Sequence, residues 1–443
     1  MEPQSVCQEQ APEAFTKWVR QAAVPLDTGG RSTRDRDLEV LKHAAKSARI
    51  VALGEAARRV EEFYQLRSRL LRFLVEQMGF TAFAMESGFA EGIKINDYLL
   101  GRTGEPANWQ DGFTFGFGDE TETQALFRWM RQYNDDLRHR RKLHFYGIDV
   151  MVPYSSPQTA LNIAFAYLDR VDPAFISSRT RTDLESSVQK LLGSGAGRSF
   201  MDRSFRKYAK LPRAEQDAYT ASISDLLARF DANRTEYIRR SSRDAYEWAQ
   251  HAAVAARQLD TTYRADVAGA KSPQELNTVM PDYIWEARDA AMFENISWAL
   301  QQEGPSGRIL LWAHNLHLFK GSVPSDRHDE RGPRLGLLLD DHFGSEYFAI
   351  GTDFDEGKPQ WQPARKAGEC GTVEYEFSRI GLPGFLLDLR LARQKRADTD
   401  WIVKPRRMRA DIPAADYLTI PSQAWDALVF IRRITPVQVV RHD

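Results

Sequence analysis

Four short apolar segments of the chain are each followed by a side chain that can carry or exchange a proton. The four side chains are Glu55, Glu86, Asp149 and His314. Carboxylates and imidazoles gathered at one place suit general acid–base catalysis, because neighbouring charges can move their pKa values toward neutrality. The same residue types also suit a metal ion bound by histidines and carboxylates. The chemistry of these four positions therefore predicts a polar site of one of these two kinds.

A second histidine strengthens this prediction, because His317 follows His314 by three residues. The sequence contains no His-Glu-x-x-His zinc motif, no Gly-x-Ser-x-Gly nucleophile motif and no phosphate-binding glycine loop after a strand. Spacing alone leaves acid–base catalysis and metal binding both open. We expect no cofactor, with a divalent metal at the Glu/His cluster as the alternative.

The segments before these residues predict strands. Residues 50–54, 80–85, 143–148 and 308–313 are short apolar runs, and amphipathic helical patterns lie between them. Alternating strands and helices predict an α/β fold with a mostly parallel central sheet flanked by helices. The carboxyl ends of parallel strands meet at one edge, where such folds bind ligands. A single acid after a strand is usually a helix N-cap. Four strands that each end in such a side chain favour a shared site.

The middle of the chain has a different pattern, because residues 157–268 show helical periodicity and no strand signal. We predict three parts. Residues 1–156 form the first part of the α/β core with N-terminal helices, residues 157–280 form a helical insertion that caps the active-site edge, and residues 281–443 form the second part of the core.

Asp149, two arginines and two phenylalanines are the candidates for substrate binding or electrostatic roles. Arg58 lies three residues after Glu55, and Arg67 lies roughly three helical turns farther on. A surface or interhelical ion pair is the alternative for either arginine. Phe113 and Phe115 alternate in a Gly-rich loop, a spacing that suits covering an apolar surface, so we expect a hydrophobic small-molecule substrate.

Charge and hydropathy limit the partners and the location. The net charge of −1 creates no field that would favour nucleic acid or an anionic membrane. No segment has the roughly 20 apolar residues that a membrane span requires, and the polar N-terminal residues lack a signal-peptide core. We therefore expect a cytoplasmic protein without a nucleic-acid or membrane partner.

Several motifs along the chain resemble those of the erythromycin esterase family. They include Gly54-Glu-Ala-Ala-Arg58, Phe83-Ala-Met-Glu-Ser-Gly88, Tyr146-Gly-Ile-Asp149 and Ala313-His-Asn-Leu-His317. The resemblance implies an α/β core with helical additions and hydrolysis of a macrolide lactone by water, without a covalent acyl-enzyme. It also implies that Glu55 and Glu86 are the two family acids, that Arg67 is the family arginine, and that His314 and His317 are the family histidine pair.

One position departs from the family pattern. Where the pattern has Gly-Glu-x-x-His, with the histidine taken as the base that activates water, this chain has Arg58. A guanidinium has a pKa above about 12 and no usable lone pair, so it cannot be that base. Glu55, Glu86 or His317 would then activate water. The alternatives are a non-hydrolytic biosynthetic enzyme (a cyclase or an eliminating enzyme) on the same scaffold, or a catalytically silent protein that binds a ligand.

Overall fold

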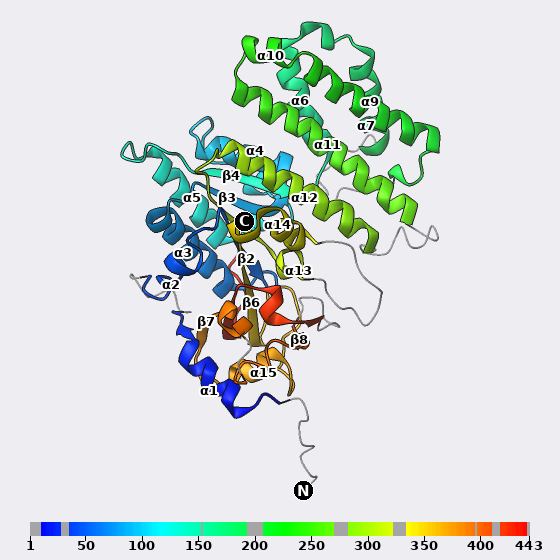
Figure 1. Ribbon diagram of the computed structural model, residues 1–443. Coiled ribbons are helices and arrows are strands. Elements are labelled where there is room, and N and C mark those ends of the chain that lie inside the picture. The colour runs from blue at the N-terminus through cyan, green and yellow to red at the C-terminus, as the bar shows by residue number, and fades with distance from the viewer. Residues whose placement is uncertain are drawn as a thin grey trace.

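A large central sheet forms the core of the protein (Figure 1). The computed structural model describes residues 10–27, 35–151, 154–192, 207–269, 282–321, 334–394, 397–409 and 417–440. The eight strands lie in the order β1-β7-β10-β6-β2-β5-β3-β4. Their bounds are β1 Val24–Pro25, β2 Ile50–Glu55, β3 Ala82–Gly88, β4 His144–Asp149, β5 Ile309–His314, β6 Tyr347–Gly357, β7 Gly384–Asp388 and β10 Ala427–Ile434.

The strand pairing is mostly parallel, as predicted. All pairs from β10 through β4 are parallel, and only the β7 edge is antiparallel, where β7 pairs with β10 and with the short strand β1. The two-residue strand β1 has too short a pattern to be read from the sequence. A separate two-stranded sheet joins β8 Arg406–Met408 to β9 Tyr417–Thr419.

Helices cover both faces of the sheet, because each central strand is apolar on both sides. Val51 and Leu53 face one hydrophobic core, formed with α3 (Glu61–Met78) and α5 (Thr121–Asp135). Ile50 and Ala52 face a second core. Its helices are α1 Glu13–Ala22, α12 Asp282–Gln302, α14 Leu335–Phe343 and α15 Val373–Ser378. The predicted α/β fold is therefore confirmed.

The remaining helices are shorter or lie at the β4 edge. The α4 helix (Phe89–Leu99) follows β3, and α13 (Asn315–Leu318) follows β5. Short helices α2 (Val40–Ala44) and α16 (Pro421–Ala424) precede β2 and β10. Two 3-10 turns, η1 Trp109–Gly112 and η2 Phe117–Asp119, shape the loop between α4 and α5.

The helical segment forms a lobe beyond the β4 edge (Figure 1). It contains α6 Pro157–Val171, α7 Arg179–Leu192, α9 Arg213–Ala232, α10 Arg234–Arg240 and α11 Arg243–Gly269, which share a third hydrophobic core. The lobe joins the sheet domain through aromatic rings, since Phe89 of α4 stacks on Trp248 of α11 and packs edge-to-face against Trp298 of α12. The three-part division at residues 156 and 280 and the capping role stay predictions; residue 280 lies outside the described residues.

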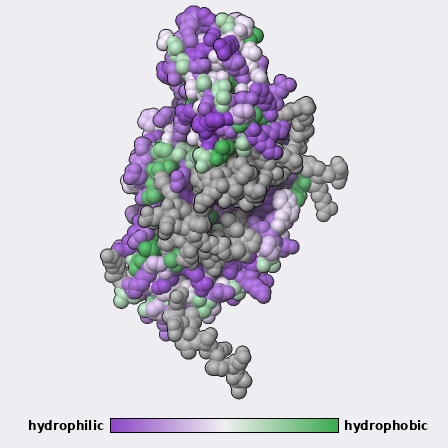
Figure 2. Space-filling view, turned by 90° about the vertical axis from the view of Figure 1, so that its right-hand side faces the viewer, coloured by the Kyte–Doolittle hydropathy of each residue, from purple (hydrophilic) through white to green (hydrophobic). Residues whose placement is uncertain are grey.

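The surface seen in Figure 2 is mainly hydrophilic over the described residues, and its hydrophobic side chains are scattered. Among the helices in the described part of the chain, none combines the length and the apolar character needed to cross a membrane.

Candidate active site

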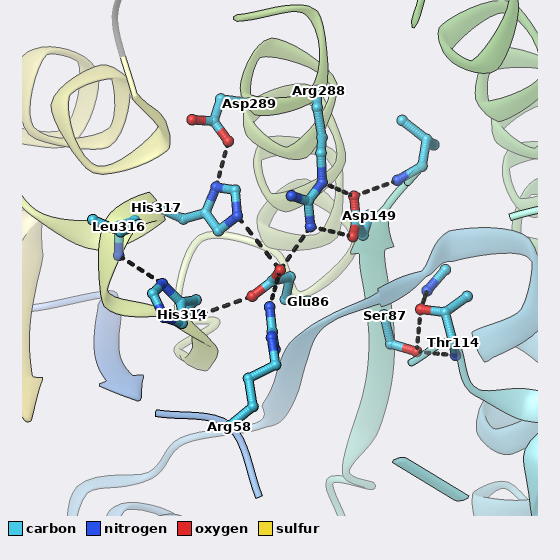
Figure 3. A network of polar contacts seen from close by, with 12 residues as sticks. Arg58, Glu86, Ser87, Thr114, Asp149, Arg288, Asp289, His314, Leu316 and His317 are labelled. Carbon is cyan, nitrogen blue, oxygen red and sulfur yellow. Dashed lines mark hydrogen bonds and ion pairs between the residues drawn. The ribbon is translucent and has the colours of Figure 1, made fainter. Parts of the chain in front are cut away.

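The sheet topology brings the predicted site residues to one edge. Strands β2, β5, β3 and β4 are consecutive parallel neighbours, so their carboxyl ends lie side by side. Glu55 is directly opposite His314 in the β2–β5 register. Glu86 lies within β3, which continues to Gly88 with a register irregularity after Met85. This irregular stretch is where Glu86 enters the network of polar contacts drawn in Figure 3.

Arg58 connects the two glutamates. Its Nη1 donates to Glu55 Oε1 at 2.7 Å, and its Nη2 donates to Glu86 Oε1. Both carboxylates are buried, whereas the Arg58 side chain keeps 19% of its surface exposed. Arg58 therefore enters from the solvent side and forms charge-assisted bonds that hold the two acids together.

Glu86 is the centre of the network. Its Oε1 also accepts a hydrogen bond from Arg288 Nη2 at 2.6 Å, and its Oε2 accepts from the backbone N–H of His314 at 2.7 Å. Burial opposes ionisation, but the surrounding positive charges, Arg58 foremost, hold the pKa of Glu86 well below its usual value. Glu86 is thus a weak base near neutral pH.

Arg288 brings Asp149 into the same network. Its Nε and Nη2 donate to the two oxygens of Asp149 at 2.9 and 2.7 Å, a bidentate pair in which both side chains are buried. Arg288 thereby links the ends of β3 and β4 (Figure 3). A buried pair of this kind fixes geometry, because removing either partner would leave an uncompensated charge.

His317 is held by a carboxylate. Its Nδ1 lies 2.5 Å from Asp289 Oδ1, and its Nε2 lies 3.4 Å from Glu86 Oε1. Burial opposes a charged imidazole, but Asp289 and Glu86 outweigh it and raise the pKa of His317 above its usual value. A carboxylate on Nδ1 fixes the ring orientation and the tautomer, which leaves Nε2 to exchange a proton.

His314 is in a different electrostatic state. Burial, together with the charge of Arg58, lowers its pKa to about 3, so its ring is neutral near pH 7. Its Nδ1 accepts a hydrogen bond from the backbone N–H of Leu316 at 3.2 Å. The hydrogen-bond pattern therefore assigns the ring proton to Nε2. His314 is a hydrogen-bond donor at Nε2 and a poor base.

A close approach between β2 and the start of α13 positions His317. A Cβ atom on Gly54 would lie 2.1 Å from Asn315 Oδ1, so only glycine leaves room for the Asn315 side chain across β2. The Asn315 amide donates to the Thr352 carbonyl at 2.7 Å and accepts from the Thr352 N–H at 3.3 Å. Helix α13 is therefore tied to β6, and His317 on α13 is held with it.

The two predicted phenylalanines lie in different places. The Phe115 ring centroid is 4.8 Å from the Arg58 guanidinium carbon and 5.8 Å from that of Arg288. Phe113 instead lies in the hydrophobic core, packed against Phe127 and Phe145. The positive φ of Phe115 (57°) turns its ring toward the site, whereas the Phe113 ring lies in the core. A third ring, Phe117, lies 5.7 Å from the Arg58 guanidinium carbon.

Arg67 lies behind the site rather than in the network around Glu86. It is fully buried, its Nη2 donates to Thr123 Oγ1 at 3.0 Å, and its guanidinium stacks 3.9 Å from the Trp312 ring centroid. Glu55 contributes to its electrostatic environment. Arg67 therefore acts on the site through charge and packing.

Sequence reasoning missed Arg288 and Asp289, which carry two of the central contacts. A signal for them existed in the sequence. Both residues lie one or two helical turns before the buried Met292 and Ile296, on the core-facing side of α12. Charged residues in such a stripe are rarely buried unless they are paired, so they are candidates for a functional network.

Among the described residues, no group of three or more His, Cys, Asp or Glu side chains is arranged to hold a metal ion. The carboxylates of the site pair instead with guanidinium groups or with His317.

A model of the erythromycin esterase family matches residues 75–434, most of the chain. The chain belongs to the erythromycin esterase family. The matched range contains Glu86, Asp149, His314 and His317, and it begins after Arg58.

Relatives in the family extend over similar lengths. Erythromycin esterase type II of Escherichia coli is 27% identical over 345 residues, covering 76% of each chain. The putative hydrolase YbfO of Bacillus subtilis is 22% identical and covers 96% of this chain and 92% of its own length. A mutant of the erythromycin esterase EreC in its open conformation has the same fold, with a TM-score of 0.72, 19% identity and coverage of 95% and 99%. Membership in the erythromycin esterase family places the chain among hydrolase-type, esterase-like enzymes.

Proposed function

We propose that this family member hydrolyses an ester or lactone of a hydrophobic, polyketide-type natural product, with His317 activating water directly. The observation that carries the proposal is the His317–Asp289 pair, with Nδ1 at 2.5 Å from the carboxylate and Nε2 directed toward Glu86. The pair has the arrangement of a general base and the group that orients it.

The proposed reaction is attack by water on the ester carbonyl. His317 Nε2 removes a proton from water while the water oxygen attacks the ester carbonyl carbon. The carbon–oxygen bond of the ester then breaks, and the leaving alkoxide takes the proton back from His317. Acid and alcohol are released, and no bond to the protein forms.

The other candidate bases are weaker. Arg58 has no lone pair at neutral pH. Glu86 is stabilised as a carboxylate by its cationic neighbours, and the neutral ring of His314 carries its proton on Nε2. In this proposal His314 donates from Nε2 to the carbonyl oxygen as negative charge develops there, as the preorganised donors of an oxyanion hole do.

The electrostatics of the site also support an uncharged substrate. The guanidinium groups of Arg58 and Arg288 already pair with carboxylates of the site, so neither is the obvious partner of a substrate anion. Phe115 and Phe117 flank Arg58 and supply an apolar surface for a hydrophobic substrate. Because each carboxylate has a cationic partner, we propose that the reaction uses no metal and no other cofactor.

The test is hydrolysis of a panel of aryl esters, simple lactones and erythromycin by the purified full chain. His317→Gln is compared with His144→Gln. His144 is a matched control, because its Nδ1 also pairs with a buried carboxylate (Glu303, 2.7 Å) but at the opposite end of β4. We expect His317→Gln to lower kcat by roughly 100-fold or more, while His144→Gln keeps most of the activity.

Three results would overturn the proposal. Equal losses in the two variants would remove His317 from the mechanism. Binding of a lactone without any product would favour the silent binding protein, and a product formed without incorporation of ¹⁸O from labelled water would favour the cyclase or eliminating enzyme.

A further inference from the structure

Three strained residues meet beside the active site. In the described part of the chain, the non-glycine residues with positive φ are Arg59 (64°), Phe115 (57°) and Trp361 (63°). Arg59 contacts both of the others: its Nη2 donates to the Phe115 carbonyl, and its guanidinium carbon lies 4.0 Å from the Trp361 ring centroid. Bulky residues keep such a backbone conformation only where their surroundings hold it, and such residues gather at functional sites.

Arg59 is held from several directions. Its Nη1 donates to the buried carboxylate of Glu120 at 3.2 Å. Its own carbonyl accepts hydrogen bonds from the backbone N–H groups of Gln360 and Val437, both at 3.1 Å. Arg59 thus ties together the segments that contain Phe115, Trp361 and the end of the chain after β10.

The neighbouring arginines have separate tasks. Arg58 bonds Glu55 and Glu86, whereas Arg59 bonds the carbonyl of Phe115. The ring of that same Phe115 lies against the Arg58 guanidinium, and it also packs 4.5 Å from the Tyr154 ring. A shift of the Phe115 backbone would therefore remove the nearer of the two rings, Phe115 and Phe117, that lie against Arg58.

We propose that Arg59 is a positioning residue, which fixes Phe115 against Arg58 and so keeps Arg58 oriented on the two active-site glutamates. This inference rests on the proposed function. Trp361 covers the outer face of the Arg59 guanidinium although 67% of its own surface is exposed, which shields the contact from water.

The competing explanation is that Arg59 only neutralises Glu120. Two variants separate the explanations. Arg59→Asn removes both contacts and retains a residue type that tolerates positive φ, so backbone strain is not added. Glu120→Gln removes the ion pair and leaves the bond from Arg59 to the Phe115 carbonyl. Arg433→Asn removes an exposed arginine paired with Glu356 and serves as the charge control.

The measurements are kcat and KM with an ester that the wild type hydrolyses, and hydrogen–deuterium exchange of the peptide covering residues 112–118. We expect Arg59→Asn to lower kcat by roughly 10- to 100-fold, with KM changed by less than about threefold, and to raise exchange in that peptide. Glu120→Gln and Arg433→Asn should leave both readouts near wild type. Arg59→Lys should recover part of kcat, because it keeps one donor to the carbonyl.

Equal effects of Arg59→Asn and Glu120→Gln would overturn the positioning role, as would wild-type kcat in Arg59→Asn.

The same measurements distinguish a failure of the proposed hydrolysis from a failure of the positioning role. If the wild type hydrolyses no ester but Arg59→Asn selectively raises exchange, the proposed hydrolysis fails while the hold on Phe115 stands. If the wild type hydrolyses esters and Arg59→Asn changes neither readout, only the positioning role fails.

Discussion

Replacing Asp289 by asparagine is the sharpest perturbation of the proposed mechanism. Asn keeps the size and an acceptor oxygen, but it removes the negative charge 2.5 Å from His317 Nδ1. Asp289 is fully buried, so little solvent screens that charge. The substitution should therefore lower the pKa of His317 and weaken it as a base, while the ring can stay in place.

The expected loss of stability is small and the expected loss of activity is large. A hydrogen bond to a charged group contributes about 1.5–3 kcal/mol and a neutral one about 0.5–1.5 kcal/mol, so the change should cost about 1–2 kcal/mol of unfolding free energy. General base catalysis contributes roughly 10²- to 10⁴-fold, which corresponds to about 3–5 kcal/mol of activation free energy.

The assay is the pH dependence of kcat together with thermal unfolding. His317 must be neutral to act as a base and its pKa is raised, so wild-type kcat should rise with pH and level off only above about pH 6.5. In Asp289→Asn that limb should move to lower pH and the plateau should fall. A plateau within about threefold of wild type, with the limb unmoved, would refute the assignment of Asp289.

Three further predictions follow from the same contacts. Arg58→His shortens the side chain and breaks the bridge between Glu55 and Glu86, so Tm should fall by several degrees. Hydrolysis of an ester that the wild type hydrolyses should fall at least as far as in Arg59→Asn, and an unchanged rate in a folded variant would contradict this. Arg288→Met leaves Asp149 buried without its counter-ion and should lower the unfolding free energy, measured with urea, by about 3–5 kcal/mol. Adding Asp149→Asn should recover part of that loss. If the losses of the two single variants simply add in the double variant, the two side chains do not interact. Because the pKa of His317 is raised in the folded protein, its charge stabilises the fold fully below about pH 6.5, and this stabilisation is lost as pH rises through the folded-state pKa. The unfolding free energies of wild type and His317→Gln should therefore converge at high pH. A difference that stays constant with pH would exclude this linkage.

The fold could be predicted from the sequence because its strands are buried on both faces. Such strands appear as continuous apolar runs, and alternation with helices then implies a parallel sheet. Glu55, Glu86, Asp149 and His314 could be brought to one edge on that basis alone. The strand bounds were less predictable, since β6 continues to Gly357 and β3 passes Glu86 to Gly88.

The partners of these residues could not be predicted, because they depend on how separate elements pack. Arg288 and Asp289 lie on α12, more than 130 residues after Asp149 in sequence, so their position on the core-facing side of that helix does not indicate which strand ends they meet. The different positions of Phe113 and Phe115 depend on the positive φ of Phe115, a conformation that no local pattern requires of a phenylalanine. The location of Arg67 behind the site depends likewise on its packing against Trp312.

The most direct test of His317 as the base is to measure its pKa by NMR titration and to compare it with the acid limb of kcat in the same protein. We predict that the two values coincide above about pH 6.5 and shift together to lower pH in Asp289→Asn. An acid limb that occurs at a different pH from the His317 titration, or that persists unchanged in His317→Gln, would contradict the mechanism.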